Sequence, residues 1–365
     1  MPGEVIQTLL KERGWTQEEL ARVIGRYRPE ISNLISGKRG VTPDLAVALG
    51  AAFDKEPEFW LQLEADRQLT FTRQDPEEVR QRAKIYTLAP IREMELRGWI
   101  PSNLNDSDLE VALCKFFGVD RLEDAGSMPV AARQSHGAIA LNPVQQAWVS
   151  RARGLASSLI VKEFQSDKID EIKTKLRKLA AYRKEARHVA PMLAEYGIRF
   201  VVVEPLRKSS IDGAAFWLDE QSPCIAVSLR FDRVDTFWFT LMHEFAHIQA
   251  GDAQSVDDNL TGENSMPTEA KDEVERRADC WAQESLVPSG ELRSFIRRVG
   301  PLYSKEKITQ FAHRVKIHPG IIVGQLHYCG EIGYRSHRAT LVKIRDVVTE
   351  TSLTDGFGHI APSSI

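Results

Sequence analysis

Two histidines four residues apart, His243 and His247, constrain the fold of this chain more than any other feature. They lie in an apolar run with helical spacing that begins near Phe237, so the sequence predicts a buried helix over about residues 234–250. Because positions i and i+4 share one face of a helix, both imidazoles point to the same place, as metal ligands do. Glu244, beside the first histidine, is placed to hydrogen-bond a water at the metal rather than to bind the metal. The alternative is a pair of core histidines that hydrogen-bond to their neighbours.

A second pair of residues favours the metal site. Glu275 and Asp279 are also four residues apart, on a segment predicted to be helical to about residue 285. Two histidines need a third protein ligand, and a carboxylate from a neighbouring helix is one known solution. Asp279 is then placed to accept the outer N–H of a ligand histidine and fix its tautomer. Together the pattern reads HExxH…ExxxD, the layout of zinc peptidases with a glutamate ligand.

Residues 1–70 are dense in helix signals. Thr16, with Glu19 three residues later, forms a capping box that opens a short helix. Gly25 predicts a turn, and Pro29 suits the first positions of a second short helix. Two short helices separated by a glycine turn predict a helix-turn-helix.

The charge around this second helix is positive, although the segment as a whole is not. Residues 1–70 hold nine Lys+Arg against eleven Asp+Glu, and the whole chain has a net charge of −3. Residues 22–39, in contrast, hold five basic residues and one acid, Glu30. A basic face of this kind is what contacts with DNA phosphates need. The alternative is a small helical domain that binds only proteins.

The N-terminal segment resembles the HigA-type antitoxins of the Xre/Cro helix-turn-helix family. The resemblance is carried by Thr16-Gln17, Arg28-Pro29, Ile31-Ser32, Gly37-Lys38-Arg39 and Pro57-Glu58-Phe59-Trp60-Leu61. It implies a homodimer that binds double-stranded operator DNA and represses a toxin–antitoxin operon, with a toxin or another regulatory protein as partner. The resemblance and the basic patch together assign DNA contacts to Gln17, Arg26, Arg28, Ser32, Asn33, Lys38 and Arg39. Two departures, Tyr27 in place of a small capping residue and the acid Glu30, leave the base preference open.

From about residue 198 the sequence becomes rich in β-formers. Apolar runs at 198–203, 214–218 and 224–229 predict two or three strands before the histidine helix. In proteins with this arrangement an edge strand commonly pairs with an extended peptide substrate. Residues 251–271 are polar, with Gly and Pro, and are expected to form a loop. The predicted fold class is mainly α with a small β-sheet (α+β), with an all-helical helix-turn-helix domain followed by a zincin-like domain.

The region from about 150 to 290 resembles the ImmA/IrrE metallopeptidase family. The resemblance is carried by Thr240-Leu241-Met242-His243-Glu244-Phe245-Ala246-His247, by Glu275-Arg276-Arg277-Ala278-Asp279-Cys280-Trp281-Ala282 and by Leu286-Val287-Pro288. It implies His243, His247 and Glu275 as Zn²⁺ ligands and Glu244 as the general base, whereas Arg277 and Trp281 depart from the family pattern. A donor for the developing oxyanion is also needed. The candidates are His313, His318, His327 and Tyr334, of which His318 and Tyr334 are carried forward, and the sequence does not choose between them.

The sequence predicts five segments. They are a helix-turn-helix domain over 1–70, a mainly helical connecting region over 71–190, a zincin-like core over 191–290, a C-terminal helical segment over 291–348 and a disordered tail over 349–365. The four isolated cysteines, and the lack of a signal peptide or a membrane-spanning run, lead us to expect a cytoplasmic protein.

These patterns predict a transcriptional regulator, an antitoxin-like repressor, that carries a zinc-dependent endopeptidase. The peptidase is expected to cleave a partner protein or the chain itself, for example near residues 70–76 or 126–132. One alternative is a plain repressor-antitoxin whose zinc domain is structural or senses a ligand. Another is a protease that uses its N-terminal domain to dock on a protein.

Overall fold

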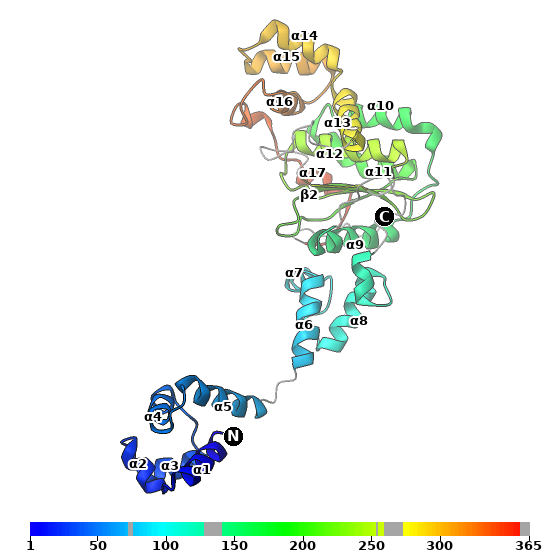
Figure 1. Ribbon diagram of the computed structural model, residues 1–365. Helices are drawn as coiled ribbons and strands as arrows, with labels where there is room; N and C mark the ends of the chain where they lie inside the picture. The colour runs from blue at the N-terminus through cyan, green and yellow to red at the C-terminus, as the bar shows by residue number, and fades with distance from the viewer. Residues whose placement is uncertain (72–75, 128–140, 253–254, 259–272, 358–365) are drawn as a thin grey trace. The chain divides into compact units, whose positions relative to one another are not determined.

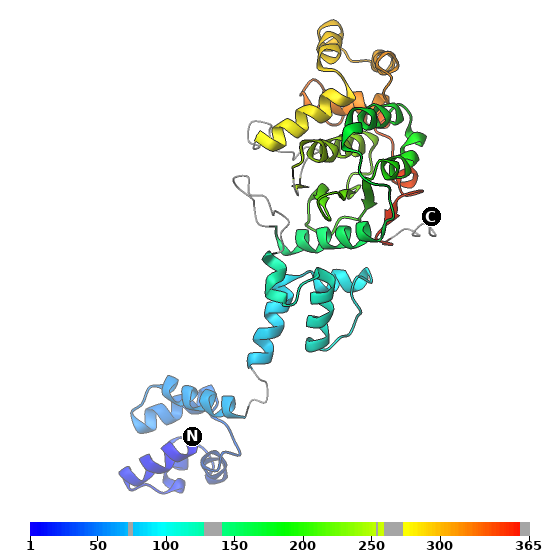
Figure 2. The same ribbon diagram turned by 90° about the vertical axis from the view of Figure 1, so that its right-hand side faces the viewer.

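The structure is a computed structural model that describes residues 1–71, 76–127, 141–252, 255–258 and 273–357 (Figures 1 and 2). The chain divides into two compact units, Met1–Gln81 and Arg82–Ile365, and helix α6 (Pro76–Leu88) runs through the division. Most described residues are helical and a single small sheet is present among them, which confirms the predicted α+β class. No helix in the described ranges is long and apolar enough to cross a membrane.

The first unit packs its helices around one apolar core. These helices are α1 (Pro2–Arg13), α2 (Gln17–Val23), α3 (Arg28–Ile35), α4 (Pro43–Phe53) and α5 (Pro57–Thr70). The capping box at the start of α2 forms as predicted, because the Glu19 N–H donates to the Thr16 hydroxyl and the Thr16 N–H donates to the Glu19 carboxylate at 2.6 Å. Trp60 of α5 is fully buried in the core.

Helices α2 and α3 form the predicted helix-turn-helix. Gly25 lies in the turn with a φ of 63°, a left-handed conformation that glycine adopts without steric cost. Leu20 of α2 and Ile31 and Leu34 of α3 are buried against the core, so the opposite face of α3 is left to solvent. Tyr27 precedes α3 as its N-cap but makes no capping hydrogen bond through its side chain.

The second unit combines a mixed sheet with helices on both faces. Its helices after α6 are α7 (Ile91–Leu96), α8 (Asp106–Phe117), η1 (Leu122–Ser127), α9 (Pro143–Ser158), η2 (Ser166–Lys168), α10 (Ile169–Leu179), η3 (Arg183–His188), α11 (Val189–Glu195), α12 (Val234–Ala250), α13 (Glu273–Leu286), α14 (Ser289–Val299), α15 (Lys305–Val315), α16 (Pro319–Tyr328), η5 (Arg338–Thr340) and α17 (Arg345–Val348). In Figure 1, α9 lies on one face of the sheet and α12 on the other.

The sheet has the strand order β4-β2-β3-β1-β5. Its strands are β1 (Arg199–Val202), β2 (Ile211–Trp217), β3 (Pro223–Val227), β4 (Ser255–Asp258) and β5 (Leu353–Thr354). β1 is parallel to β3 and β5, whereas β2 is antiparallel to both β3 and β4. The three strands predicted before the histidine helix are therefore all present.

Both faces of the sheet are buried, which explains why its strands read as continuous apolar runs. In β1, Phe200 and Val202 enter the core shared with α12, whereas Val201 enters the core shared with α8 and α9. Ile225 and Ala226 of β3 divide in the same way. Successive side chains on a strand point to opposite faces, so one strand contributes to two cores.

The C-terminal tail corrects one expectation. Residues 349–357 were expected to be disordered, but β5 pairs in parallel with β1, with Val201 opposite Leu353. Asp355 is buried beside Arg97, at 3.4 Å, in a side-chain ion pair that joins the tail to α7. Residues 358–365 lie outside the described part of the chain. The finer boundaries near 190, 290 and 348 stay predictions, since one apolar core includes residues from 172 to 348.

Candidate functional site

Helix α12 forms the centre of the second unit and carries the histidine pair. It lies against β2 and β3 on one side and against α13 and α16 on the others, so nearly all of its residues are buried. The helix ends at Gly251, which has a φ of 68° and serves as a left-handed C-cap. His243 and His247 are 0% exposed, so their ring nitrogens must find partners inside the protein.

The two histidines and Glu275 converge on one point. The Nε2 atoms of His243 and His247 are 3.1 Å apart. Glu275 Oε2 lies 3.2 Å from the first nitrogen, and Glu275 Oε1 lies 3.6 Å from the second. Zinc bonds of 2.0–2.1 Å in a tetrahedron would separate two ligand atoms by about 3.3 Å. The three side chains therefore fit a Zn²⁺ ion, and they form a group within the described residues that is able to hold a metal.

Glu244 is fully buried next to this group and faces the sheet. A Cβ atom at Gly213 of β2 would lie only 2.4 Å from Glu244 Oε1, so any larger residue at position 213 would collide with the carboxylate. The absence of a side chain at this position gives the Glu244 carboxylate its space. Glu244 is thus held beside the ligands without being one of the three converging groups.

The outer nitrogen of each histidine faces a carboxylate. Asp279 Oδ1 lies 3.0 Å from His243 Nδ1, so the structure brings the two groups together, and the role expected for Asp279 stays a prediction. Asp252 Oδ2 lies 3.3 Å from His247 Nδ1 and accepts a hydrogen bond of 2.5 Å from Arg277. The hydrogen bond to His247, followed by that to Arg277, holds the pKa of Asp252 below its ordinary value. A carboxylate at this place orients the ring and fixes its tautomer.

Sequence reasoning missed Asp252 and gave Arg277 no role near the ligands. The signal for Asp252 was its position immediately after Gly251, the C-cap of the helix, and five residues beyond His247. Arg277 was noted only as a departure from a family pattern. In the structure it is the cation that holds Asp252 against His247.

The outer edge of β2 is covered by β4. The sequence placed residues 251–271 in a loop, but Ser255–Asp258 pair antiparallel with β2, with Asp257 opposite Gly213. The loop expectation is therefore wrong for residues 255–258, and most of its remaining residues lie outside the described ranges. A segment of the chain itself occupies the edge next to Glu244.

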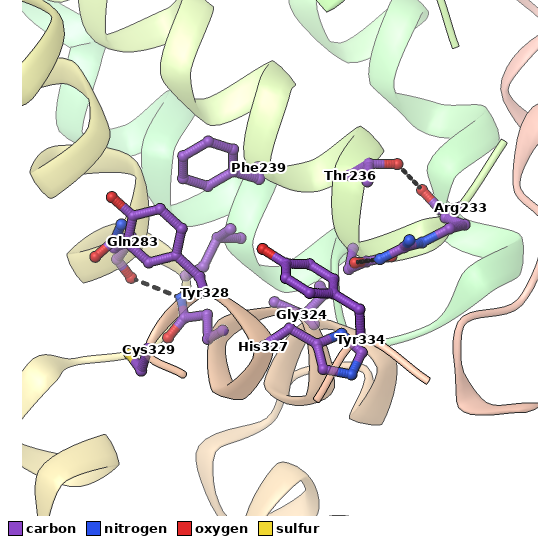
Figure 3. Close-up of a pocket in the computed structure, with 13 residues that line it drawn as sticks. Arg233, Thr236, Phe239, Gln283, Gly324, His327, Tyr328, Cys329 and Tyr334 are labelled. Atoms are coloured by element: carbon purple, nitrogen blue, oxygen red, sulfur yellow. Dashed lines mark hydrogen bonds and ion pairs between the residues drawn. The ribbon is translucent and has the colours of Figure 1, made fainter. Parts of the chain in front are cut away.

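The two oxyanion candidates lie in different surroundings. His318 caps α16, because its Nδ1 accepts a hydrogen bond of 3.0 Å from the Gly320 N–H, and burial lowers its pKa. A Cβ at Gly320 would touch Val234, which precedes His243 by nine residues, or about 13 Å along the helix. Tyr334 instead lines a pocket with Phe239, whose ring centroid is 6.0 Å from that of His243 (Figure 3). Tyr334 thus shares a pocket with a side chain that contacts a ligand histidine.

The remaining two histidines are also placed. His313 is exposed on α15. His327 is buried in α16, and its Nε2 lies 3.0 Å from the Ser336 carbonyl oxygen. For these two, as for His318 and Tyr334, an oxyanion role stays a prediction.

The residues assigned to DNA contact gather around α3. Gln17 is half-buried at the start of α2, and the others are exposed in the turn, on α3 or just after it: Arg26, Arg28, Ser32, Asn33, Lys38 and Arg39. Glu30, whose effect on DNA binding was open, accepts a hydrogen bond of 2.7 Å from Arg39. The acid is therefore paired in the structure, and Arg39 is partly engaged by it.

Comparison with known proteins identifies two families in this chain. The helix-turn-helix family matches residues 6–60, and the peptidase M78 family, the IrrE N-terminal-like domain, matches residues 194–323. Both families agree with the resemblances seen in the sequence. No solved structure matches the chain.

Individual relatives are similar over part of the chain. Virulence-associated protein A' of Dichelobacter nodosus is 31% identical over 111 residues, which are 30% of this chain and 84% of that protein. The uncharacterized HTH-type transcriptional regulator YddM of Escherichia coli (strain K12) is 33% identical over 63 residues, 17% of this chain and 67% of that protein. Antitoxin HigA-1 of Vibrio cholerae serotype O1 is 41% identical over 64 residues, 17% of this chain and 59% of that protein.

Proposed function

Since this chain belongs to the helix-turn-helix transcriptional regulators and carries a peptidase M78 domain in the same polypeptide, we propose that its second unit is a zinc-dependent endopeptidase. The observation that carries the proposal is the convergence of His243, His247 and Glu275 beside the buried carboxylate of Glu244. Two neutral imidazoles and a carboxylate are a ligand set of catalytic zinc sites, which keep a fourth position for water or substrate.

The residues around the ligands support a hydrolytic role. His243, His247 and Glu275 would hold the Zn²⁺ ion, while Asp279 and Asp252 keep the two imidazoles in the tautomer that leaves Nε2 free to bind it. A bound Zn²⁺ ion lowers the pKa of water toward neutrality and polarises the carbonyl that is attacked.

Glu244 is the proton carrier in this proposal. Its carboxylate takes a proton from the attacking water and passes it to the amine that leaves when the peptide bond breaks. Burial between α12 and Gly213 keeps bulk water away from the carboxylate, so the proton is exchanged within the site. His318 and Tyr334 remain the candidate donors to the oxyanion.

The helix-turn-helix provides the regulatory half of the proposal. The exposed basic residues around α3 would bind operator DNA, with the protein acting as a homodimer and a toxin or another regulatory protein as partner. A cut near residues 70–76 would separate the helix-turn-helix from the peptidase and end repression. Residues 72–75, like most of the second candidate site at 126–132, lie outside the described residues.

The test of this function is Glu244→Gln, which keeps the size of the side chain and removes the base. We expect this variant to bind zinc and operator DNA like the parent but to lose proteolysis of its target. Glu273→Gln, an exposed glutamate on α13, is the matched control and should behave like the parent in all three assays.

The decisive measurement compares parent and variants expressed in the native host, with and without stress. Mass spectrometry detects fragments of the chain and of its partner proteins. A reporter gene under the operator measures repression. Fragments and derepression that depend on Glu244 support the peptidase. Identical fragment patterns and identical repression would reject it and favour a repressor whose zinc domain is structural or senses a ligand.

A further inference from the structure

The metal site continues along the interface of α12 and α13. On α12, His247, His243 and Phe239 succeed one another at intervals of four residues, and on α13 Glu275, Asp279 and Gln283 do the same. His247 faces Glu275 at 3.6 Å, and His243 faces Asp279 at 3.0 Å. The next pair in this series, Phe239 and Gln283, has no metal-binding group and lines a pocket.

This pocket is predominantly apolar and has aromatic walls. Figure 3 shows the rings of Phe239, Tyr328 and Tyr334 around one space, and Leu286 and Ile321 complete the apolar lining. Its floor is α16, which approaches α12 closely because Gly324 has no side chain: a Cβ there would lie 2.7 Å from the Asp235 Cβ. Of the residues that line this pocket, the sequence pointed only to His327 and Tyr334, as oxyanion candidates.

Several polar groups of the pocket already have partners. The Asp235 carboxylate is paired with Arg233, and the Gln325 amide donates to the Gln283 carbonyl at 3.2 Å. The buried His327 side chain is paired at one nitrogen, because its Nε2 contacts the Ser336 carbonyl while its Nδ1 has no hydrogen-bond partner among the described residues. Nε2 therefore carries the proton, and Nδ1 is a buried acceptor that a donor on an occupant would satisfy.

The pocket lies close to the ligand histidine His243, because Phe239 belongs to its lining and also contacts the His243 ring. The Phe239 ring centroid is 6.0 Å from that of His243, close to the rise of a single helical turn, about 5.4 Å. A polypeptide whose carbonyl lay at the metal site would therefore have its neighbouring side chain about one helical turn from Phe239, within reach of the pocket. Such a polypeptide also has one N–H per residue, which suits the free acceptor of His327 better than a hydrocarbon does.

We propose that this pocket binds a large apolar side chain, aromatic or branched aliphatic, of the substrate residue next to the cleaved bond. The assignment rests on the proposed peptidase function and names its substrate class. Phe239, Tyr328 and Tyr334 determine specificity by packing on that side chain. A charged side chain is excluded, because its burial finds no free countercharge beside the Arg233–Asp235 ion pair.

Cys329 provides a probe of the pocket with a matched control. It lines the pocket and is exposed, so a larger residue there occupies space in the pocket without disturbing the core. Cys280 is also exposed, on α13, but does not line the pocket. Cys329→Trp and Cys280→Trp thus place the same ring inside and outside the proposed site.

The first arm measures cleavage of a peptide library by the zinc-loaded full chain. We expect the parent to select Leu, Ile, Met, Phe or Tyr at one position beside the cut. Cys329→Trp should cleave those peptides about 10- to 200-fold more slowly relative to peptides with Ala at that position. Cys280→Trp should keep the parent's selection. Equal selection by Cys329→Trp and the parent would overturn the assignment.

The second arm measures binding without cleavage, in the Glu244→Gln variant. Short peptides containing leucine or phenylalanine should slow the labelling of Cys329 by iodoacetamide at least several-fold and leave Cys280 unaffected, whereas aspartate peptides should protect neither.

Protection in this arm together with no cleavage by the parent supports the pocket and rejects the peptidase. Cleavage without side-chain selection or protection supports the peptidase and rejects the pocket. If N-acetyl-leucine amide protects Cys329 as well as the leucine peptides do, the pocket binds a small molecule and not a residue of a polypeptide substrate. This result would overturn the assignment.

Discussion

Asp279 Oδ1 lies 3.0 Å from Nδ1 of His243, and both side chains are buried. Nε2 of the same imidazole lies 3.2 Å from Glu275 Oε2 and 3.1 Å from His247 Nε2. Neither side chain is reached by solvent, and a buried polar group without a partner is costly. The aspartate and the histidine therefore stabilise each other. The candidate metal site therefore has two layers of side chains, and the outer layer is placed to orient the inner.

The outer layer should be measurable as metal affinity. We expect Asp279→Asn to weaken zinc binding by about 10- to 100-fold, because the amide no longer fixes the His243 tautomer. Competition with a chromophoric chelator gives the affinity, and circular dichroism checks that the fold is retained. Asp170→Asn, an exposed aspartate on α10, is the control. An unchanged zinc affinity in a folded Asp279→Asn protein would contradict the role given to this aspartate.

The inner layer should determine occupancy. We expect the parent to hold about one zinc per chain, and His243→Ala or Glu275→Ala to lower the zinc content sharply, since two protein ligands do not complete a zinc site. Glu275 is the better test because it is partly exposed, whereas removal of the buried His243 also leaves a cavity. Elemental analysis of protein prepared without chelators gives the content. Glu275→Ala protein with the parent's zinc content would show that the ligand set is wrong.

Local periodicity explains which parts of the site the sequence could predict. His243, His247, Glu275 and Asp279 are found by spacing alone, because a helix places residues four apart on one face. Asp252 was missed because its contact with His247 depends on the direction that the chain takes after Gly251. No pattern of helical spacing covers a residue beyond the end of its helix.

Long-range pairing explains the largest error in the fold. The run from residue 199 is apolar enough to be recognised as a strand because both of its faces are buried. β5, in contrast, has two residues and gains its place only by pairing with Val201 and Val202, which are about 150 positions earlier in the chain. A polar tail therefore looked disordered, although Ser352 and Asp355 are buried.

Glu64 should make the first unit sensitive to acid. Its carboxylate accepts hydrogen bonds from Arg67, Gln68 and the Val41 N–H, and the bonds to Arg67 above all lower its pKa to about 2. A lowered carboxyl pKa contributes stability that is complete above the unfolded value of 4.5 and is lost as the pH falls from there through about 2. We therefore expect hydrogen exchange in residues 43–70 of the full chain, corrected for the intrinsic rate, to speed up over this window.

Glu64→Gln is the matched test of that titration. It should raise exchange in residues 43–70 already at neutral pH and remove most of the acceleration below pH 4.5, since the group that titrates is gone. Glu58→Gln, an exposed glutamate on the same helix, should retain the pH dependence of the parent. The same acid response in Glu64→Gln and the parent would assign the titration to another group.

Arg28 should report on the DNA-binding face of α3. It is exposed at the first position of the helix, with no ion pair to another described residue, whereas Arg39 is paired with Glu30. We expect the protein to bind an inverted repeat near its own promoter with an affinity that falls steeply as salt rises. Arg28→Ala should weaken binding by about 1–3 kcal/mol and relax specificity at one base pair if Arg28 reads a guanine.

Binding measured over a series of salt concentrations distinguishes a contact of Arg28 with a base from a contact with a phosphate. Loss of a base contact leaves the slope of log affinity against log salt unchanged, whereas loss of one phosphate contact lowers it by about 0.9. Lys11→Ala, an exposed cation at the end of α1, is the control of equal charge change and should match the parent on every sequence. Equal operator binding by the parent and Arg28→Ala across the salt series would mean that the N-terminal end of α3 does not enter the groove. The DNA-binding face would then have to lie elsewhere on the first unit.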